Sequence, residues 1–330
     1  MMATKAQRIS FMPVLMPNEH LLSAVCRGIK LGTVNHWRDF LNDPKSDGSE
    51  FCSGHVLRPL YASVCSQYHG TTQDVILRNH SLWHYFRSFI PGDHREIPSR
   101  ENWSTIYNHK QNLHPLKLVR YRQTKQWRWC LECAQQDYDT YGFSYWHVEH
   151  QLPGISHCQH HPESQLRGAC NSCGSQVTDI REKSVRLFPE NRCPVCHTPF
   201  DNYESTPNHP IIDWVTEISR QLQSGSELDV QLLRKDLFEA LGIDPKTKTA
   251  AGIKRTSIAR KMIRDELPLD VINWFFQTEE RGSFKAGDNI SPLDLKLLYD
   301  TSSFVHPLSW LIISWIILSK NRTLDSYLIQ

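Results

Sequence analysis

The chain has 330 residues, of which 39% are hydrophobic and 22% are charged. This length and composition allow substantial hydrophobic cores and suggest two or three domains. The formal net charge of only +2 excludes a uniformly basic coat for nucleic acid. No apolar signal segment follows the charged start of the chain, so nothing there directs it to an oxidising compartment, and we expect a cytoplasmic protein.

Residues 1–115 are predicted to form a helical domain. Apolar residues between Leu21 and Ile29 recur at the spacing of one packed helix face. Asn18, just before them, is the residue expected to cap this helix. A second helical run covers residues 60–68.

The second run leads into a turn that is typical of a helix-turn-helix motif. Gly70 stops the run, and Thr71 or Thr72 can cap a third helix. A helix, a short glycine-containing turn and a capped helix make the outline of that DNA-binding motif. Most helix pairs joined by a short loop never touch DNA, so side chains on the third helix face either base edges or water. The side chains concerned are Gln73, Asn79 and His80.

Residues 102–131 contain no acidic residue, although six Lys and Arg side chains are interleaved with aromatic ones there. Cations for phosphates with aromatic rings between them are typical of a nucleic-acid contact. A solvated basic face would have the same composition, so both interpretations stay open. A second basic cluster near residue 260 is weaker because Asp265 and Glu266 follow at once. The candidate DNA contacts are Lys110, Lys117, Arg120, Arg122, Lys125, Arg128, Arg255, Arg260 and Lys261, and the interleaved aromatic residues are Tyr107, Tyr121, Trp127 and Trp129.

Four pairs of metal-ligand residues share a two-residue spacing in the predicted middle module, residues 116–206. The first two pairs read C-x2-C-x24-C-x2-H. The last two read C-x2-C-x19-C-x2-C, which lies inside the spacing range of a structural zinc ribbon. The two predicted ligand sets are Cys130, Cys133, Cys158 and His161, and Cys170, Cys173, Cys193 and Cys196.

Metal geometry explains this spacing. Two cysteines three positions apart on a tight turn place both thiolates about 2.3 Å from one tetrahedral ion, and a second such turn completes the shell. Gly174 and Pro194 are turn residues that suit these positions. Disulfides are the alternative, but they need an oxidising compartment. We therefore expect two structural zinc ions with full shells, while Cys26, Cys52 and Cys65 are ordinary thiols.

A catalytic zinc site is a second alternative. The segment His147-Val148-Glu149, followed by a later C-x2-C, superficially resembles zinc nucleobase deaminases. That chemistry requires a proline directly before its first cysteine, whereas Pro194 lies inside the last pair. Every cysteine pair also has a closer partner of matching spacing, so we expect no enzyme. His147, Glu149 and His150 are then structural polar residues or contacts to a partner.

Residues 207–330 are predicted to form a second helical domain. The segment 308–318 is strongly apolar, but eleven residues are too few to span a bilayer, so we expect a buried core helix and no membrane association. The other predicted helices cover residues 211–222, 228–241 with Gly242 as the stop, 256–266 and 269–276. The expected fold is thus mostly α-helical with small zinc-stabilised β or loop modules, in which helical domains flank a double zinc-binding module.

The residues between the ligand pairs carry a family resemblance. They are Asp137, Gly142, Tyr145-Trp146, His150-Gln151-Leu152-Pro153-Gly154 and Gly174, set among the cysteine pairs. In this pattern the chain resembles the TniQ/TnsD family of transposon target-selection proteins. The resemblance is specific through about residues 127–196. Segments 17–23, 80–83 and 306–310 extend it more loosely over nearly the whole chain, and 80–83 is similar to the TnsD branch.

The resemblance implies a function without catalysis in a bacterial, nucleoid-associated protein. Such proteins mark the insertion site of a heteromeric Tn-seven-like transposon and recruit its AAA+ ATPase, TnsC. TnsD-like members bind a chromosomal attachment sequence themselves. TniQ members of CRISPR-associated systems, often homodimers, instead bind a guide-RNA Cascade complex. By resemblance too, the eight ligand residues hold two zinc ions.

The chain departs from the longer TnsD proteins, which continue beyond the counterpart of segment 308–318 into further helical DNA-reading regions. This leaves open whether the chain is a short family member or part of a longer one. Direct reading of DNA and targeting through Cascade therefore both stay open at this point.

Overall fold

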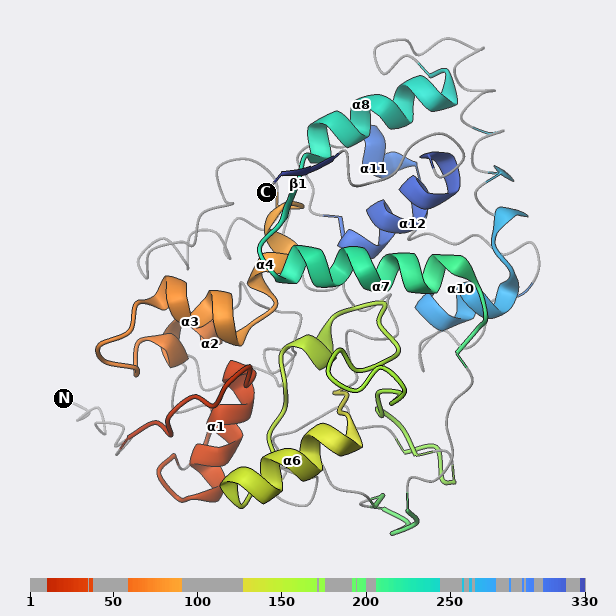
Figure 1. Ribbon diagram of the computed structural model, residues 1–330. Helices are drawn as coiled ribbons and strands as arrows, with labels where there is room; N and C mark the ends of the chain where they lie inside the picture. The colour runs from red at the N-terminus through yellow and green to blue at the C-terminus, as the bar shows by residue number, and fades with distance from the viewer. Residues whose placement is uncertain are drawn as a thin grey trace, which may run out of the picture.

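A computed structural model describes part of the chain, and every structural statement below concerns that part. The described residues are 11–34, 36–37, 59–90, 127–170, 172–175, 192–193, 195–199, 206–243, 257, 261–262, 265–276, 285, 293, 295–299, 305–318 and 327–329. They are mostly helical, with one pair of very short strands (Figure 1). The expected fold class is confirmed in this coarse sense, as a helical protein with Cys/His clusters.

Helix α1, Leu21–Lys30, is the most deeply buried part of the N-terminal stretch, and eight of its ten residues are buried. The predicted apolar face accounts for four of these residues, and the helix is also buried on its other sides, at Ser23, Ala24, Arg27 and Gly28. The predicted cap is wrong, because the side chain of His20 accepts the hydrogen bond from the backbone N–H of Leu22. Asn18 instead has a positive φ of 56° and forms the turn before the helix.

Helices α2, Pro59–Cys65, and α3, Gln73–His80, match the predicted helix pair, and they lie side by side. Thr72 caps α3 through its hydroxyl oxygen, which accepts from Val75 N at 3.4 Å. Of the side chains expected on this helix, Asn79 is exposed and Gln73 is half-buried. His80 is engaged elsewhere, because its Nδ1 lies 2.8 Å from the carbonyl oxygen of Glu19.

The middle of the chain contributes α6, Leu131–Tyr141, and the short 3-10 helix η6, Glu149–Gln151. Before α1 the chain forms an isolated antiparallel bridge between Glu19 and His147. Two backbone hydrogen bonds flank it, from His20 N to Trp146 O at 2.7 Å and from Val148 N to Asn18 O at 2.8 Å. The N-terminal helices are therefore joined to the middle stretch by main-chain pairing as well as by side chains.

Helix α7, Pro210–Gln223, runs through the centre of the molecule (Figure 1), between the first half of the chain and the last helices. Helix α8, Val230–Leu241, follows it and ends at Gly242, as predicted. Between them β1, Glu227–Leu228, pairs antiparallel with β2, Leu328–Ile329. This pairing brings residues about one hundred positions apart to one place.

The C-terminal stretch contributes the last helices, of which α12, Pro307–Leu318, packs against both α7 and α8. The other later helices are α10, Leu269–Phe276, and α11, Lys296–Tyr299. Helix α4, Trp83–Arg87, belongs to the first half of the chain. Helix α12 is buried on nearly every side, as its apolar sequence predicts. The predicted helix 256–266 lies largely outside the described residues.

Within the described residues, no helix is both long enough and apolar enough to cross a bilayer.

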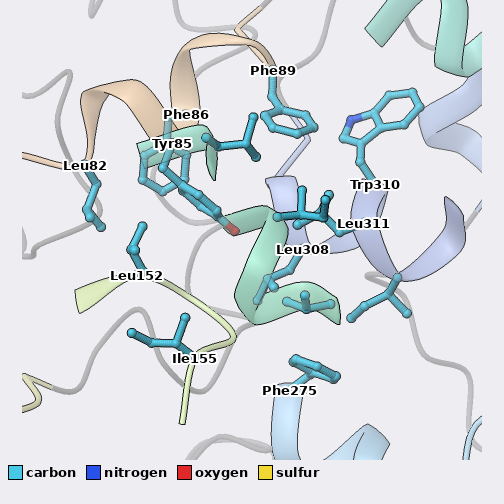
Figure 2. Packing of buried hydrophobic residues seen from close by; sticks show 14 of the residues in the cluster. Leu82, Tyr85, Phe86, Phe89, Leu152, Ile155, Phe275, Leu308, Trp310 and Leu311 are labelled. Carbon is cyan, nitrogen blue, oxygen red and sulfur yellow. The ribbon is translucent and has the colours of Figure 1, made fainter. Parts of the chain in front are cut away.

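One hydrophobic cluster contains side chains from all three predicted domain ranges. Figure 2 shows Leu152 and Ile155 of the middle stretch near side chains of α4, together with Phe275 of α10 and Leu308 of α12. The predicted boundaries remain a prediction. What the structure adds is that the middle stretch contributes to the same core as the helices around it.

Candidate metal centres

The first predicted ligand set converges at the start of α6. Cys130 directly precedes this helix and Cys133 lies in its first turn, so one helix end holds both sulfurs. Cys158 and His161 approach from the loop that follows Pro153. The Cys133 Sγ atom lies 3.3 Å from His161 Nδ1 and 3.5 Å from Cys158 Sγ, and Cys130 Sγ lies 3.5 Å from His161 Nδ1.

These distances distinguish a metal site from a disulfide. A disulfide joins two sulfurs at about 2.05 Å. Thiolates that share a tetrahedral zinc ion at about 2.3 Å lie about 3.8 Å from each other, and a thiolate and an imidazole nitrogen lie slightly closer. The observed 3.3 to 3.5 Å separations match the second case, and the cysteines are free thiols. The four residues form a group that could hold one metal ion.

Neighbouring side chains orient the first cluster. Gln136 Nε2 lies 3.0 Å from His161 Nε2, which leaves Nδ1 of the same ring directed at the sulfurs. His150 Nε2 lies 3.5 Å from Cys158 Sγ from the opposite side. Such partners around the ligands fix ring orientation in metal sites. Cys130, Cys133 and Cys158 are at most 3% exposed, so this cluster lies inside the protein.

The second set, Cys170, Cys173, Cys193 and Cys196, forms two similar turns that face each other. In the first turn Gly174 N donates to Cys170 O at 2.8 Å, and in the second His197 N donates to Cys193 O at 2.9 Å. The sulfurs approach across the turns, with Cys170–Cys196 and Cys173–Cys193 both 3.6 Å apart. This group too could hold a metal ion. Pro194, the other predicted turn residue, lies outside the described residues.

At least one thiol in each cluster is favoured in its thiolate form, which is the form that binds metals. Hydrogen bonds from Cys130 and then Cys133 lower the pKa of Cys158 well below its ordinary value. Burial raises the pKa of Cys193, but hydrogen bonds from the Cys196 backbone and the Ser175 hydroxyl outweigh it and bring the pKa to about 6. Both clusters thus favour a negatively charged sulfur in a place where a cation would be bound.

A third group of possible ligands consists of His147, Glu149 and His150, the residues of the deaminase alternative. They do not take part in either cysteine cluster, where each pair meets the partner predicted from the spacing. His147 Nε2 lies 2.8 Å from Asp137 Oδ2, and its ring stacks on Tyr145. Burial lowers the pKa of His150, which keeps its imidazole neutral.

The candidate DNA contacts are placed less favourably. Arg128 was predicted wrongly, because it is 5% exposed and its guanidinium donates to the carbonyl oxygens of Leu152 and Ile155. Trp127 and Trp129 are also buried, and both pack edge-on against Trp146. The amino-acid composition alone therefore does not distinguish a nucleic-acid contact from a buried arginine that hydrogen-bonds to a loop beside aromatic rings of the core.

The remaining candidates divide in two. Lys261 is exposed and is available to a phosphate. The others lie outside the described residues, and their assignment stays a prediction: Lys110, Lys117, Arg120, Arg122, Lys125, Arg255 and Arg260.

Several structural residues were not predicted from the sequence. His20, His209 and His306 each cap a helix by accepting a backbone N–H through Nδ1. Histidine is not among the usual capping residues, although the His-Pro pairs before α7 and α12 were a usable signal. The buried ion pair of Glu19 with Arg27, at 2.7 Å, has no local sequence signature.

No protein-family model matches the chain, and a search of the curated proteins also finds no match.

Proposed function

We propose that this protein is a target-site selector of a heteromeric Tn-seven-like transposon, which binds target DNA and recruits the AAA+ ATPase TnsC without catalysing a reaction itself. The two Cys/His clusters each hold one structural zinc ion in this proposal. The observation that carries it is that the four segments resembling the TniQ/TnsD family, although scattered over nearly 300 residues, are packed against one another.

Hydrogen bonds to the backbone join the first three of these segments. Segment 17–23 pairs with the middle one through the bond from His20 N to Trp146 O. The same segment binds segment 80–83 through Glu19 O, which lies 2.8 Å from His80 Nδ1. Three separate sequence matches therefore correspond to one connected piece of structure.

The fourth segment meets the middle one at Gly154. This residue has a φ of +92°, and a Cβ atom placed on it would lie 2.9 Å from Leu308 Cδ2 of α12 and 2.6 Å from Val215 Cγ1 of α7. A glycine is thus required where the loop after η6 passes between two helices. Short motifs that match by chance have no reason to meet in this way, which supports the resemblance as one of fold.

The zinc part of the proposal has a direct test. Purified, reduced protein should retain about two zinc ions per chain after exhaustive dialysis against metal-free buffer, because full thiolate shells release zinc slowly. Folded protein without zinc would refute this part.

The DNA part rests on the predicted basic stretch and on the α2–α3 pair. Arg120→Ala combined with Lys125→Ala should weaken binding to attachment-site DNA and reduce the slope of log K against log salt by about 2, since each lost phosphate contact removes about 1. Lys30→Ala with Lys235→Ala removes the same charge from two exposed lysines elsewhere and serves as the control. Equal affinity and slope in both double variants would contradict the DNA assignment.

One observation favours a second candidate, a TniQ-type adaptor that binds a guide-RNA Cascade complex and contacts little DNA. Arg128 and two of the four interleaved aromatic residues are buried, so fewer of the predicted side chains are accessible to DNA. A pull-down with Cascade subunits, compared with footprinting on free attachment-site DNA with and without TnsC, separates the two. A footprint without Cascade supports the first candidate, and capture by Cascade without a footprint supports the second.

A further inference from the structure

An open cleft of about 830 Å³ lies where α3, α6, η6 and α7 approach one another. Its lining contains several histidine and carboxylate side chains. The residues of interest here are Asp137, His147, Glu149 and His160. All four come from the middle stretch, and neither cysteine cluster uses them.

His147 is held with one ring nitrogen unused. Its Nε2 lies 2.8 Å from Asp137 Oδ2, and a carboxylate can only accept, so Nε2 carries the proton. The lone pair of the neutral ring is then on Nδ1. That atom is buried and has no hydrogen-bond partner among the described residues. The residue as a whole is only 8% exposed, so water does not readily satisfy it.

His150 repeats this arrangement from the other side. Its Nε2 lies 3.5 Å from Cys158 Sγ, and a metal-binding thiolate accepts, so Nε2 again donates. Its Nδ1 is likewise buried and unpartnered within the described part of the chain. Two imidazoles three residues apart thus each keep a lone pair in a buried position, an arrangement that costs free energy unless a donor or a cation binds there.

Glu149 completes the group with a negative charge. One oxygen of its carboxylate and one ring nitrogen from each of His147 and His150 lie within 4.8 Å of one another. The ligands of a single ion lie about 3 to 4 Å apart. The rings of His147 and His150 stack at 4.8 Å with an interplanar angle of 28°, so binding requires the rings to turn toward one ion and the side chains to close on it. Glu149 is now paired with His160 at 2.6 Å, but that ring is 55% exposed and can move away.

We propose that His147, Glu149 and His150 form a third metal site, which takes a divalent transition-metal ion and is distinct from the two cysteine clusters. Two imidazoles and one carboxylate suit zinc or another late first-row metal better than magnesium or calcium, which prefer oxygen ligands alone. Because His147 and Glu149 line the cleft, an ion can reach this group from solvent through it. In zinc deaminases the glutamate is not a ligand, so this site is of a different kind.

Asp137 acts here as a positioning residue. It fixes the tautomer and the orientation of His147, in the way that carboxylates support metal-binding histidines. Asp137→Asn should therefore lower the affinity of the third site by about 10- to 100-fold while the two cysteine clusters keep their metal. A structural role alone would change the thermal stability without this selective loss of affinity.

The test counts bound zinc. Full-length protein with both cysteine clusters loaded is dialysed to equilibrium against increasing free zinc, and the metal content per chain is measured. We expect a third, reversible equivalent in the wild type, and its loss in His147→Asn combined with Glu149→Gln. Glu163→Gln makes the same carboxylate-to-amide change at an exposed position of the same module, and it should keep all three.

Two results would overturn the site: saturation of the wild type at two equivalents, or a third equivalent that persists in the double variant. If the double variant does not fold, anomalous diffraction from wild-type crystals soaked in zinc decides instead. A peak between His147, Glu149 and His150 supports the site, and peaks at the two cysteine clusters alone contradict it. None of these results depends on DNA binding or TnsC, so the site and the proposed function can fail separately.

Discussion

The two ligand clusters, one of three cysteines and a histidine and the other of four cysteines, have different surroundings. In the first, all three cysteines are buried, His161 is half-buried, and Cys158 contacts the buried His150. The second is peripheral, with Cys173 exposed and Cys196 half-buried. The two clusters also differ in their neighbours: Cys130, Cys133 and Cys158 form a small buried group of their own with Leu166, whereas Cys170 and Cys193 belong to the central hydrophobic cluster and hold two turns against it.

This difference implies that metal loss has unequal consequences. The first cluster holds α6 against the loop that begins at Gly154, and this loop packs on α7 and α12 at that glycine. Losing that ion should disturb contacts far from the ligands. Losing the second ion should chiefly disturb the turns around Cys170 and Cys193 and the side chains that pack on them.

The largest effect is expected for Cys158→Ala. Removing one ligand of the first cluster forfeits much of a metal-binding free energy of about 10 kcal/mol or more, which is comparable with the whole stability of a typical domain. The variant should lose one zinc ion and its cooperative thermal transition, monitored by tryptophan fluorescence. Cys65→Ala removes an equally buried thiol that has no metal role and should cost only about 1–2 kcal/mol. A cooperative transition at the wild-type temperature in Cys158→Ala would abolish the distinction between the clusters.

A smaller effect tests the link between the first cluster and the core. In Gly154→Ala the added methyl group overlaps Val215 and Leu308, and the backbone must keep a φ of +92°. We expect a loss of about 2–4 kcal/mol in the free energy of unfolding, measured by urea denaturation. Gly142→Ala also has a positive φ but no atom within 4 Å of the new methyl group, so it should cost only about 1–2 kcal/mol. Equal costs at both positions would show that the loop is not tightly held.

Local patterns in the sequence were sufficient for some features and not for others. The ligand clusters were predictable because each pair is set by a four-residue turn, and α8 was predictable because its periodicity and Gly242 are local. The burial of Arg128 was not, since its partners Leu152 and Ile155 lie more than twenty residues away. The group of His147, Glu149 and His150 was not predictable as a metal site for a similar reason. Only the contacts with Asp137 and Cys158 show which ring nitrogens have no hydrogen-bond partner among the described residues.

Acid provides a way to separate loss of metal from weakening of the core. Low pH should release zinc held by the proposed clusters, but the core has its own acid-sensitive group in His306, which caps α12 and packs on Tyr85 and Phe86. Burial lowers the pKa of His306 to about 3. Between its ordinary value near 6.5 and about 3 the unfolded chain binds a proton that the folded chain does not, so stability falls as the pH falls.

The slope of this loss is at most about 1.4 kcal/mol per pH unit, or roughly 2 kcal/mol between pH 6.5 and pH 5. His306→Asn keeps a capping acceptor but does not titrate. Its denaturation midpoint should therefore fall less steeply with acid than that of the wild type, in zinc-saturated buffer. Parallel pH profiles would assign all of the acid sensitivity to the metal clusters.

The smallest effect on the core is expected for Cys173→Ala, the counterpart of the first variant. Cys173 is exposed, and its sulfur contacts Cys193 and Ser175 within the second cluster. The variant should lose one zinc ion, yet its main thermal transition should change by less than about 1 kcal/mol, because Cys173 is exposed and, among the described residues, is not part of the central hydrophobic cluster. Proteolysis should instead increase selectively near residues 170–199. A shift as large as that of Cys158→Ala would mean that the two clusters are coupled, and that the module responds to metal as one unit between the helical regions.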